Sequence, residues 1–321
     1  MALVSQSGAF AIARASALPW LNPRFVITVG NQMDVTVGEW LEHLVDEPGL
    51  EVVGCYVEGF RPGDGARFLR AARAHVAEGR VVVLSRGGRT PEGQDATASH
   101  TASLAGDYAL TRLLAERAGV LVAETAAEFT GLLALGVRLA GRRVEGRRAA
   151  LVSNAGFECV AMADALGGLE RADLAEVTRA RLGAVLEGAR LGGIVAPTNP
   201  LDLTPITGDE GFATAVSAML DDPGVDVAVV GCVPLTPALQ TLRQEDGEDL
   251  AAPSALAARL SALWRGTEKA WVVSVDAGPR YDAFAGLLSA SGIPVLRQAD
   301  RATALLARYV SARLGTRGRG G

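Results

Sequence analysis

Three features in the first half of the chain could together handle a phosphoryl group. Ser7 and Gly8 open a helical pattern, and the first backbone N–H groups of a helix attract anions. Glu58 follows an apolar run, and His100 lies in a polar stretch, residues 86–104, that we expect to be a loop. A neutral imidazole can attack phosphorus while a carboxylate orients its other ring nitrogen. These residue types suit a histidine that accepts a phosphoryl group.

The same residues also have plainer interpretations. His100 could be an exposed loop histidine, and Glu58 could cap a helix or pair with Arg61. Arg86 and Arg89 could bind phosphate or CoA, but a solvated loop charge is at least as common for such residues. The residues alone leave these alternatives open.

A second phosphate-binding turn is expected at Asn154-Ala155-Gly156. Residues 150–157 repeat the pattern of residues 2–10, a short strand that turns into a helix. If the two helix starts faced each other, a phosphate on His100 would lie between two helix ends, each carrying roughly half a positive charge. Glu158 falls in the first turn of the second helix, where it would repel a phosphate if it faced inward.

The elements that must position these residues alternate along the chain. Short β-branched runs alternate with amphipathic Ala/Leu/Arg-rich segments, which predicts βαβ units and a mainly parallel sheet. We predict an α/β protein with two tandem flavodoxin-like, doubly wound domains, in which ligands bind at the carboxyl ends of the strands. The domains span residues 1–143 and 148–314, separated by a break in periodicity, and 315–321 form a flexible tail.

The expected boundaries follow the apolar runs. In the first half the expected strands are 2–4, 25–29, 51–57, 81–85 and 120–123, and the expected helices are 10–18, 37–45, 65–78, 105–117 and 126–139. In the second half the expected strands are 149–152, 225–230, 270–275 and 294–296, with helices ending near residues 166 and 314.

Composition excludes several classes of protein. The 321 residues include 31 Lys plus Arg against 36 Asp plus Glu, so the net charge of −5 argues against nucleic acid as a partner. Lys269 is the one lysine, so a Walker-type phosphate loop is excluded. Cys55, Cys159 and Cys232 are too far apart for a zinc motif or a disulfide framework. No apolar stretch is long enough to span a membrane, and we expect a cytoplasmic protein without a metal site.

Several motifs, in this order, resemble those of the NDP-forming acyl-CoA synthetases, a family that includes ADP-forming acetyl-CoA synthetase and succinyl-CoA synthetase. They are Ser5-Gln6-Ser7-Gly8-Ala9, Gly30-Asn31-Gln32-Met33-Asp34, Tyr56-Val57-Glu58-Gly59, residues 88–93 and Ser99-His100-Thr101, followed in the second half by residues 152–156 and Asn199-Pro200-Leu201-Asp202. The resemblance implies that His100 is a phosphohistidine on a mobile loop and that Glu58 supports it. It also implies that Ser7, Gly8, Asn154, Ala155 and Gly156 bind phosphate.

The implied reaction interconverts acyl-CoA, NDP and phosphate with a free acid, CoA and NTP, through an acyl phosphate and then the phosphohistidine. CoA, phosphate and ATP or ADP with Mg would be substrates, with no tightly bound cofactor. The family's CoA-binding and ATP-grasp domains have no counterpart in the sequence, so we expect them as partner domains or subunits, with a small carboxylic acid as acyl substrate and a possible homo-oligomer. Two positions depart from the family pattern: Ala102 replaces a glycine, and Ala155-Gly156-Phe157-Glu158 replaces a Gly-Gly-Pro-Gly run.

Two alternatives remain at this stage. A regulatory or scaffold relative that has lost turnover is consistent with the missing domains and with the altered turn. A serine hydrolase using Ser7 lacks the Gly-x-Ser-x-Gly elbow, because position 5 is serine, and has no obvious aspartate partner for His100.

Overall fold

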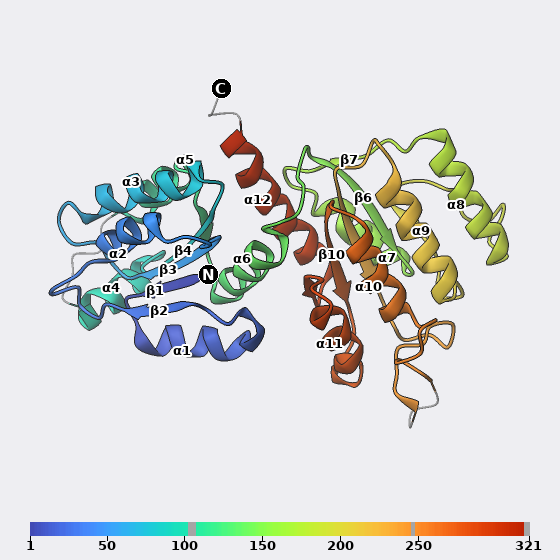
Figure 1. Ribbon diagram of the computed structural model, residues 1–321, viewed down its shortest axis with the longest axis horizontal. Coiled ribbons are helices and arrows are strands. Elements are labelled where there is room, and N and C mark those ends of the chain that lie inside the picture. The colour runs from blue at the N-terminus through green and yellow to red at the C-terminus, as the bar shows by residue number, and fades with distance from the viewer. Residues whose placement is uncertain (102–106, 245–247, 318–321) are drawn as a thin grey trace. The chain divides into compact units, whose positions relative to one another are not determined.

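The chain folds into two compact α/β units. The computed structural model describes residues 1–101, 107–244 and 248–317. One unit comprises Met1–Ala140 with the end of the chain from Ala312, and the other comprises Gly141–Ser311. Each unit contains a parallel sheet flanked by helices (Figure 1). No helix within the described ranges is both long and apolar enough to cross a membrane.

The first unit has a five-stranded parallel sheet in the order β2-β1-β3-β4-β5, the strand order of flavodoxin. The strands are β1 (Ala2–Ser5), β2 (Phe25–Thr28), β3 (Val52–Val57), β4 (Val81–Arg86) and β5 (Leu121–Ala123). Ser5 pairs with Tyr56, and Val57 pairs with Arg86, so the carboxyl ends of three central strands lie at one edge. This arrangement confirms the predicted fold class.

Helices cover both faces of this sheet. They are α1 (Gly8–Ala17), α2 (Val37–His43), α3 (Asp64–Ala77), α5 (Tyr108–Arg117) and α6 (Ala126–Leu139). The helix α3 packs against α2 and α5 on one face, where Phe68 is buried. On the other face α6 contacts β3 and β4, and its Phe129 lies 5.4 Å from the ring of Phe10 in α1. The apolar spacing of the sequence therefore identifies the helical faces that form the core.

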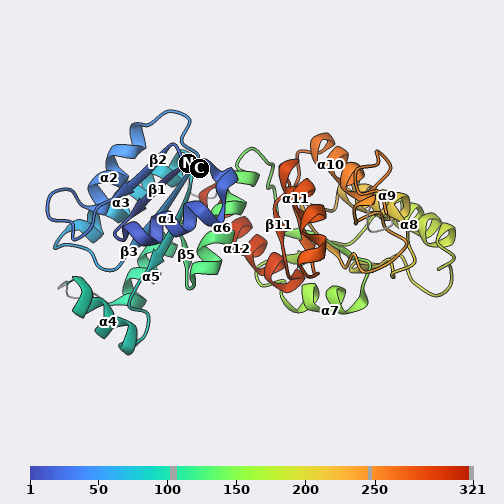
Figure 2. The ribbon, with the colours of Figure 1, turned by 90° about the horizontal axis from the view of Figure 1, so that it is seen from below.

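The polar stretch 86–104 is not the loop that we expected. It contains a helix, α4 (Pro91–Thr101), which lies outside the helical layers on the two faces of the sheet (Figure 2). Thr90 begins it: Thr90 Oγ1 accepts from Gly93 N at 3.2 Å, and Thr90 O accepts from Gln94 N at 2.8 Å. Proline at the first helical position is already in a helical conformation. Few apolar residues lie in this segment, so hydrophobic periodicity does not reveal the helix; residues 102–104 lie outside the described part of the chain.

The second unit has a parallel sheet in the order β11-β10-β9-β6-β7, with β8 also pairing with β6. The strands are β6 (Arg148–Ser153), β7 (Glu170–Arg171), β8 (Leu201–Asp202), β9 (Val227–Cys232), β10 (Ala270–Val275) and β11 (Val295–Leu296). The helices are α7 (Gly156–Asp164), α8 (Glu176–Gly188), α9 (Asp209–Asp221), α10 (Leu256–Gly266), α11 (Asp282–Ala290) and α12 (Ala299–Arg317).

A side chain completes the edge of this second sheet. The strand β7 pairs with the start of β6 and β8 pairs with its end, which leaves a gap between two short pieces. Asn199 fills the gap: its Oδ1 accepts from Leu151 N at 2.8 Å, and its Nδ2 donates to Ala149 O at 2.8 Å and to Ala172 O at 3.0 Å. One amide therefore replaces the ladder hydrogen bonds that a continuous strand would make.

Candidate functional site

The turn after β1 is held by two serines. Ser5 Oγ accepts from Ser7 N at 3.2 Å and donates to Ser7 O at 2.6 Å. Ser7 is the N-cap of α1, and its Oγ accepts from Phe10 N at 3.3 Å. A Cβ at Gly8 would meet nothing within 4 Å, so the backbone there is open to a ligand. Ser7 and Gly8 thus lie at a helix start suited to an anion.

Two buried glutamines fix the backbone of Glu58. Gln6 Oε1 accepts from Glu58 N at 2.8 Å and from Gly59 N at 3.2 Å. Gln32 Nε2 donates to Gly59 O at 2.7 Å, and its Oε1 accepts from Val37 N at 3.2 Å. Both glutamines belong to motifs noted in the sequence, but their role is visible only when β1, β2 and β3 lie side by side.

The carboxylate of Glu58 accepts a hydrogen bond from Tyr56. The phenol oxygen lies 3.2 Å from Glu58 Oε1, and the ring of Tyr56 stacks on that of Phe10 at 4.0 Å between centroids. Burial, together with the neighbouring Glu58 carboxylate, raises the pKa of Tyr56 to about 12. Tyr56 therefore remains a protonated donor near neutral pH and orients the Glu58 carboxylate.

The helix α4 and Glu58 both lie next to Gly87. A Cβ placed on Gly87 would lie 3.6 Å from Glu58 Cγ and 3.6 Å from the Oγ1 of Thr97, a buried residue of α4. His100 is in the same helix, less than one turn beyond Thr97. The structure therefore brings the helix that carries His100 and Glu58 to the same glycine, while the His100 side chain itself lies outside the described part.

Arg86 is not the solvated loop charge considered above. It is the last residue of β4, only 6% of its surface is exposed, and burial lowers the pKa of its guanidinium. It donates to Gly87 O at 3.3 Å and lies over the ring of Tyr108, 5.8 Å from its centroid. Arg89 is half exposed and pairs with Glu124 at 3.5 Å. Arg86 thus adds a buried positive charge at the edge where Glu58 lies.

The second unit contains a similar turn after β6. Asn154 Oδ1 accepts from Val233 N and its Nδ2 donates to Val233 O, both at 2.8 Å. Ala155 is the N-cap of α7 and makes no side-chain capping bond. A Cβ on Gly156 would lie 2.9 Å from Asp202 Oδ2, so a side chain there would have to displace the Asp202 carboxylate. Asn154, Ala155 and Gly156 form the start of a helix, as the sequence predicts.

Glu158 faces inward, into the protein interior. It is fully buried, Ser153 Oγ donates to its Oε2, and burial raises the pKa of its carboxyl group to about 7. The ionised form is therefore poorly solvated in this position.

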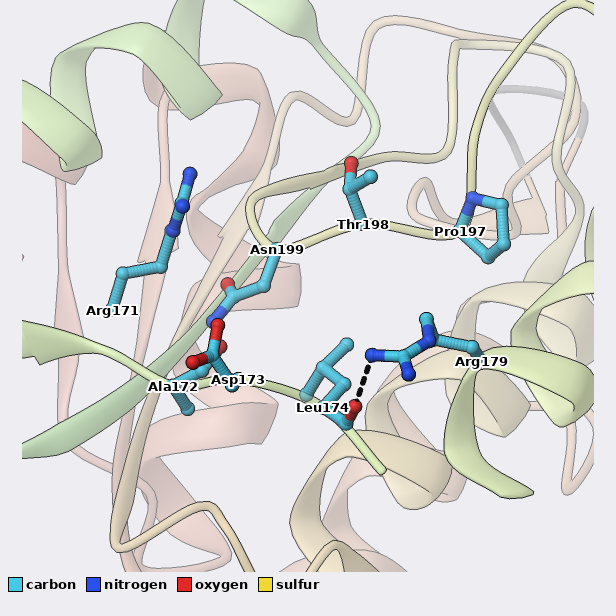
Figure 3. Close-up of a pocket in the computed structure, with 8 residues that line it drawn as sticks. All are labelled: Arg171, Ala172, Asp173, Leu174, Arg179, Pro197, Thr198 and Asn199. Atoms are coloured by element: carbon cyan, nitrogen blue, oxygen red, sulfur yellow. Dashed lines mark hydrogen bonds between the residues drawn. The ribbon is translucent and has the colours of Figure 1, made fainter. Parts of the chain in front are cut away.

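A small cavity of about 170 Å³ lies elsewhere in the second unit, beside the gap in the sheet edge (Figure 3). Arg171 and Arg179 lie among its lining residues, with Arg179 donating to Leu174 O, and Asn199 forms part of its wall. None of the predicted site residues lines it. Within the described ranges, no group of three or more His, Cys, Asp or Glu side chains could hold a metal ion.

The strand order and the two turns define a flavodoxin-like α/β protein. Residues 1–135 match the family model described as the succinyl-CoA ligase like flavodoxin domain. The α subunit of the ADP-forming acetate–CoA ligase II of Pyrococcus furiosus is 31% identical over 237 residues, covering 73% of this chain and 50% of that subunit. The ADP-forming acetate–CoA ligase I of Archaeoglobus fulgidus is 29% identical over 321 residues, covering 96% of this chain and 42% of the relative.

A solved structure shares the fold. The acetyl-coenzyme A synthetase 1 of Candidatus Korarchaeum cryptofilum, in complex with phosphate and ADP, superposes with a TM-score of 0.84 at 24% identity, covering all of this chain and 66% of that one. The chain belongs to the NDP-forming acyl-CoA synthetase family. It spans half the length or less of the two curated relatives named here.

Proposed function

We propose that this chain is the phosphohistidine-bearing core of an NDP-forming acid–CoA ligase. The observation that carries the proposal is the position of α4, the helix that contains His100: its Thr97 and Glu58 both lie next to Gly87, at the carboxyl ends of β3 and β4. Family membership supports an acid–CoA ligase, and the relatives' names include ADP-forming acetate–CoA ligases. CoA-binding and ATP-grasp functions belong to partner domains or subunits.

His100 is the proposed nucleophile. Its neutral ring nitrogen attacks the phosphorus of an acyl phosphate, the bond from phosphorus to the acyl oxygen breaks, and the free carboxylate leaves. The phosphoryl group then passes from His100 to the NDP, which becomes NTP and restores the neutral imidazole. Glu58, held by Gln6 and Tyr56, accepts the hydrogen bond of the other ring nitrogen and stabilises the imidazolium character that develops.

Backbone amides hold the phosphoryl group in this proposal. The start of α1, at Ser7 and Gly8, serves the first unit, and the start of α7, at Asn154, Ala155 and Gly156, serves the second. Arg86 adds a buried cation at the same edge as Glu58. Mg²⁺ accompanies the nucleotide as part of the substrate, and a cytoplasmic location fits the three free, buried cysteines.

The test uses an acyl phosphate as phosphoryl donor, because the described chain then needs no nucleotide domain. The full chain is incubated with acetyl [³²P]phosphate, and the label is tested for the acid lability and base stability of a phosphohistidine. We expect labelling of the wild type and of His43→Asn, an exposed histidine of α2, and none of His100→Asn. Label that persists in His100→Asn would show that another residue is the acceptor.

A non-catalytic relative is the second candidate, and the altered turn before Glu158 favours it. It predicts no label on His100 from any acyl phosphate. It also predicts that adding CoA-binding and ATP-grasp chains of a relative restores no ligase activity, whereas the ligase core predicts that it does.

A further inference from the structure

The two units begin with the same strand–turn–helix arrangement, but they differ in one layer of the side chains that pack within it. Gln6 in the first unit and Asn154 in the second each accept a backbone N–H just beyond the neighbouring strand, from Glu58 and from Val233. Phe10 lies four residues after Gln6, and Glu158 lies four residues after Asn154. The two residues therefore occupy equivalent positions in the two units.

Tyr56 of β3 lies two residues before Glu58, and Gly231 of β9 lies two residues before Val233, so these two residues are equivalent as well. The first unit stacks the rings of Phe10 and Tyr56 in this layer, and the second unit places a carboxyl group over a glycine.

The second unit accommodates the Glu158 carboxyl by omitting a side chain. A Cβ on Gly231 would collide with Glu158 Oε2 and would lie 3.0 Å from Ser153 Cβ. Ser274 of β10 pairs with Gly231 in the sheet, so its hydroxyl lies on the strand beside the carboxyl group. Glycine inside a strand weakens it, and close approach by another group is a common reason for its presence.

Two polar atoms in this cluster have no hydrogen-bond partner. Glu158 Oε1 and Ser274 Oγ both belong to fully buried residues, and neither makes a hydrogen bond of good geometry. A buried oxygen without a partner costs stability, so these two atoms together require explanation. A proton on Glu158 Oε1 would give the carboxyl group a donor for Ser274 Oγ, whereas a hydrogen bond from Ser274 to the ionised carboxylate lowers the pKa of Glu158.

The carboxyl group reaches the α7 turn through Ser153. Ser153 Oγ donates to Glu158 Oε2 at 2.5 Å and accepts from Ala155 N at 3.1 Å. A hydroxyl has one donor and two acceptor positions, so the position of Glu158 fixes the direction in which Ser153 can accept. Ala155 has no side chain that could cap α7, and the turn therefore depends on this relay.

Burial and a neighbouring carboxylate disfavour the negative charge of Glu158 and outweigh the hydrogen bonds from Ser153 and Ser274, which favour it. Asp276, which follows β10, raises the pKa of Glu158, and Asp202, the last residue of β8, lies beside Gly156. Cys159 of α7 and Cys232 of β9 also face it, and burial keeps both thiols protonated. Among the described residues, no cation contributes to the pKa of Glu158.

We propose that Glu158 is the positioning residue of the α7 turn, that it works through Ser153 as a neutral acid, and that an anion bound at the turn is accompanied by a proton on Glu158. The inference rests on the proposed function, because that function assigns a phosphoryl group to this turn. An ionised Glu158 within the first turn repels the anion, and a neutral one leaves the N–H groups of α7 free to bind it. Anion binding and proton binding therefore favour each other.

The test measures sulfate binding to the full chain by NMR at pH 6, 7 and 8, following the amide signals of Ala155, Gly156 and Phe157. Sulfate keeps two negative charges over this range, whereas inorganic phosphate itself titrates. We expect the sulfate affinity of the wild type to fall roughly tenfold from pH 6 to pH 8, the size expected for one added charge nearby. In Glu158→Gln the affinity should be the same at all three values.

Glu176→Gln is the matched control, because Glu176 lies in the first turn of α8 with 85% of its side chain exposed. It should keep the wild-type pH profile. A flat profile in the wild type, a sloping profile in Glu158→Gln or an absence of sulfate shifts at these amides would overturn the inference. His100→Asn should show the same pH profile as the wild type, so a failed phosphorylation test and a failed sulfate test are distinguishable.

Discussion

Gln6 binds the backbone of Glu58: its Oε1 accepts the Glu58 N–H at 2.8 Å and the Gly59 N–H at 3.2 Å. The two residues lie at the ends of neighbouring strands and are 52 positions apart in the chain. The catalytic carboxylate of the proposal is thus positioned from two directions, at its backbone by Gln6 and at its Oε1 by Tyr56.

Replacing Gln6 by methionine should slow the labelling of His100 while the protein still folds. The variant loses both hydrogen bonds and leaves two backbone N–H groups without a partner, at a cost of about 1–3 kcal/mol in the free energy of unfolding. Gln6→Glu keeps an acceptor of the same shape and should restore most of the rate. Urea unfolding and single-turnover labelling with acetyl phosphate check both effects; equal rates in the methionine variant and the wild type would contradict the positioning role.

Arg86→Met should lower the labelling rate by roughly 10²-fold, since a buried cation stabilises charge more strongly than an exposed one. Its removal should cost little stability, because burial of the guanidinium already lowers its pKa. Arg89→Met is the control, as Arg89 is half exposed and paired with Glu124. If both variants lose activity equally, or if Arg86→Met only unfolds the protein, Arg86 has no specific role in phosphoryl transfer.

Strands and most helices of the first unit could be predicted from the sequence to within about three residues. Their β-branched runs and their apolar spacing are local patterns, and the predicted 126–139 matches α6. The helix α4 was missed because apolar periodicity is weak in it, although Thr90-Pro91-Glu92 already forms a helix start. Cap residues here carried more information than hydrophobicity.

Features that depend on distant contacts could not be predicted. The strands β7 and β8 have two residues each. The sheet edge between them is completed by Asn199, which binds Leu151 although the two residues are 48 positions apart in the chain. Similarly, the sequence places Glu158 in a first turn but cannot say which way it faces. Gly231, 73 positions further on, decides this by providing the space for the carboxyl group.

Asn199→Ala should lower the free energy of unfolding by about 2 kcal/mol or more. The change leaves Leu151 N without its partner and removes the Asn199 donor from Ala172 O and from Ala149 O, although Ala149 O keeps the N–H of Ala172. Each unsatisfied buried group costs about 1–3 kcal/mol. Thr198→Ala, an exposed neighbour, should stay within about 0.5 kcal/mol of the wild type. Below the denaturation range His100 labelling should be unchanged, since Asn199 lies in the other unit; reduced labelling of the folded variant would contradict this separation.

Glu158→Gln should stabilise the protein at pH 8 and leave it nearly unchanged at pH 4.5 and below. The pKa of Glu158 rises from its ordinary 4.5 to about 7 on folding, so the folded chain binds a proton that the unfolded chain releases. Below pH 4.5, the pKa in the unfolded chain, Glu158 is protonated in both states and does not lower the free energy of unfolding. As the pH rises from about 4.5 through 7, the free energy of unfolding falls. At about 1.4 kcal/mol per pKa unit, the penalty above pH 7 is about 3 kcal/mol.

Glutamine has the shape of the neutral acid and carries no charge, so Glu158→Gln should remove the loss of stability at alkaline pH. Urea midpoints of wild type and variant, measured between pH 4 and pH 8, should coincide at the acid end and separate towards the alkaline end. Glu176→Gln should follow the wild type throughout, because its exposed carboxylate is solvated in both states. Parallel curves for Glu158→Gln and the wild type would mean that the pKa of Glu158 is the same in the folded and the unfolded chain, and that the buried carboxyl group is not held as a neutral acid.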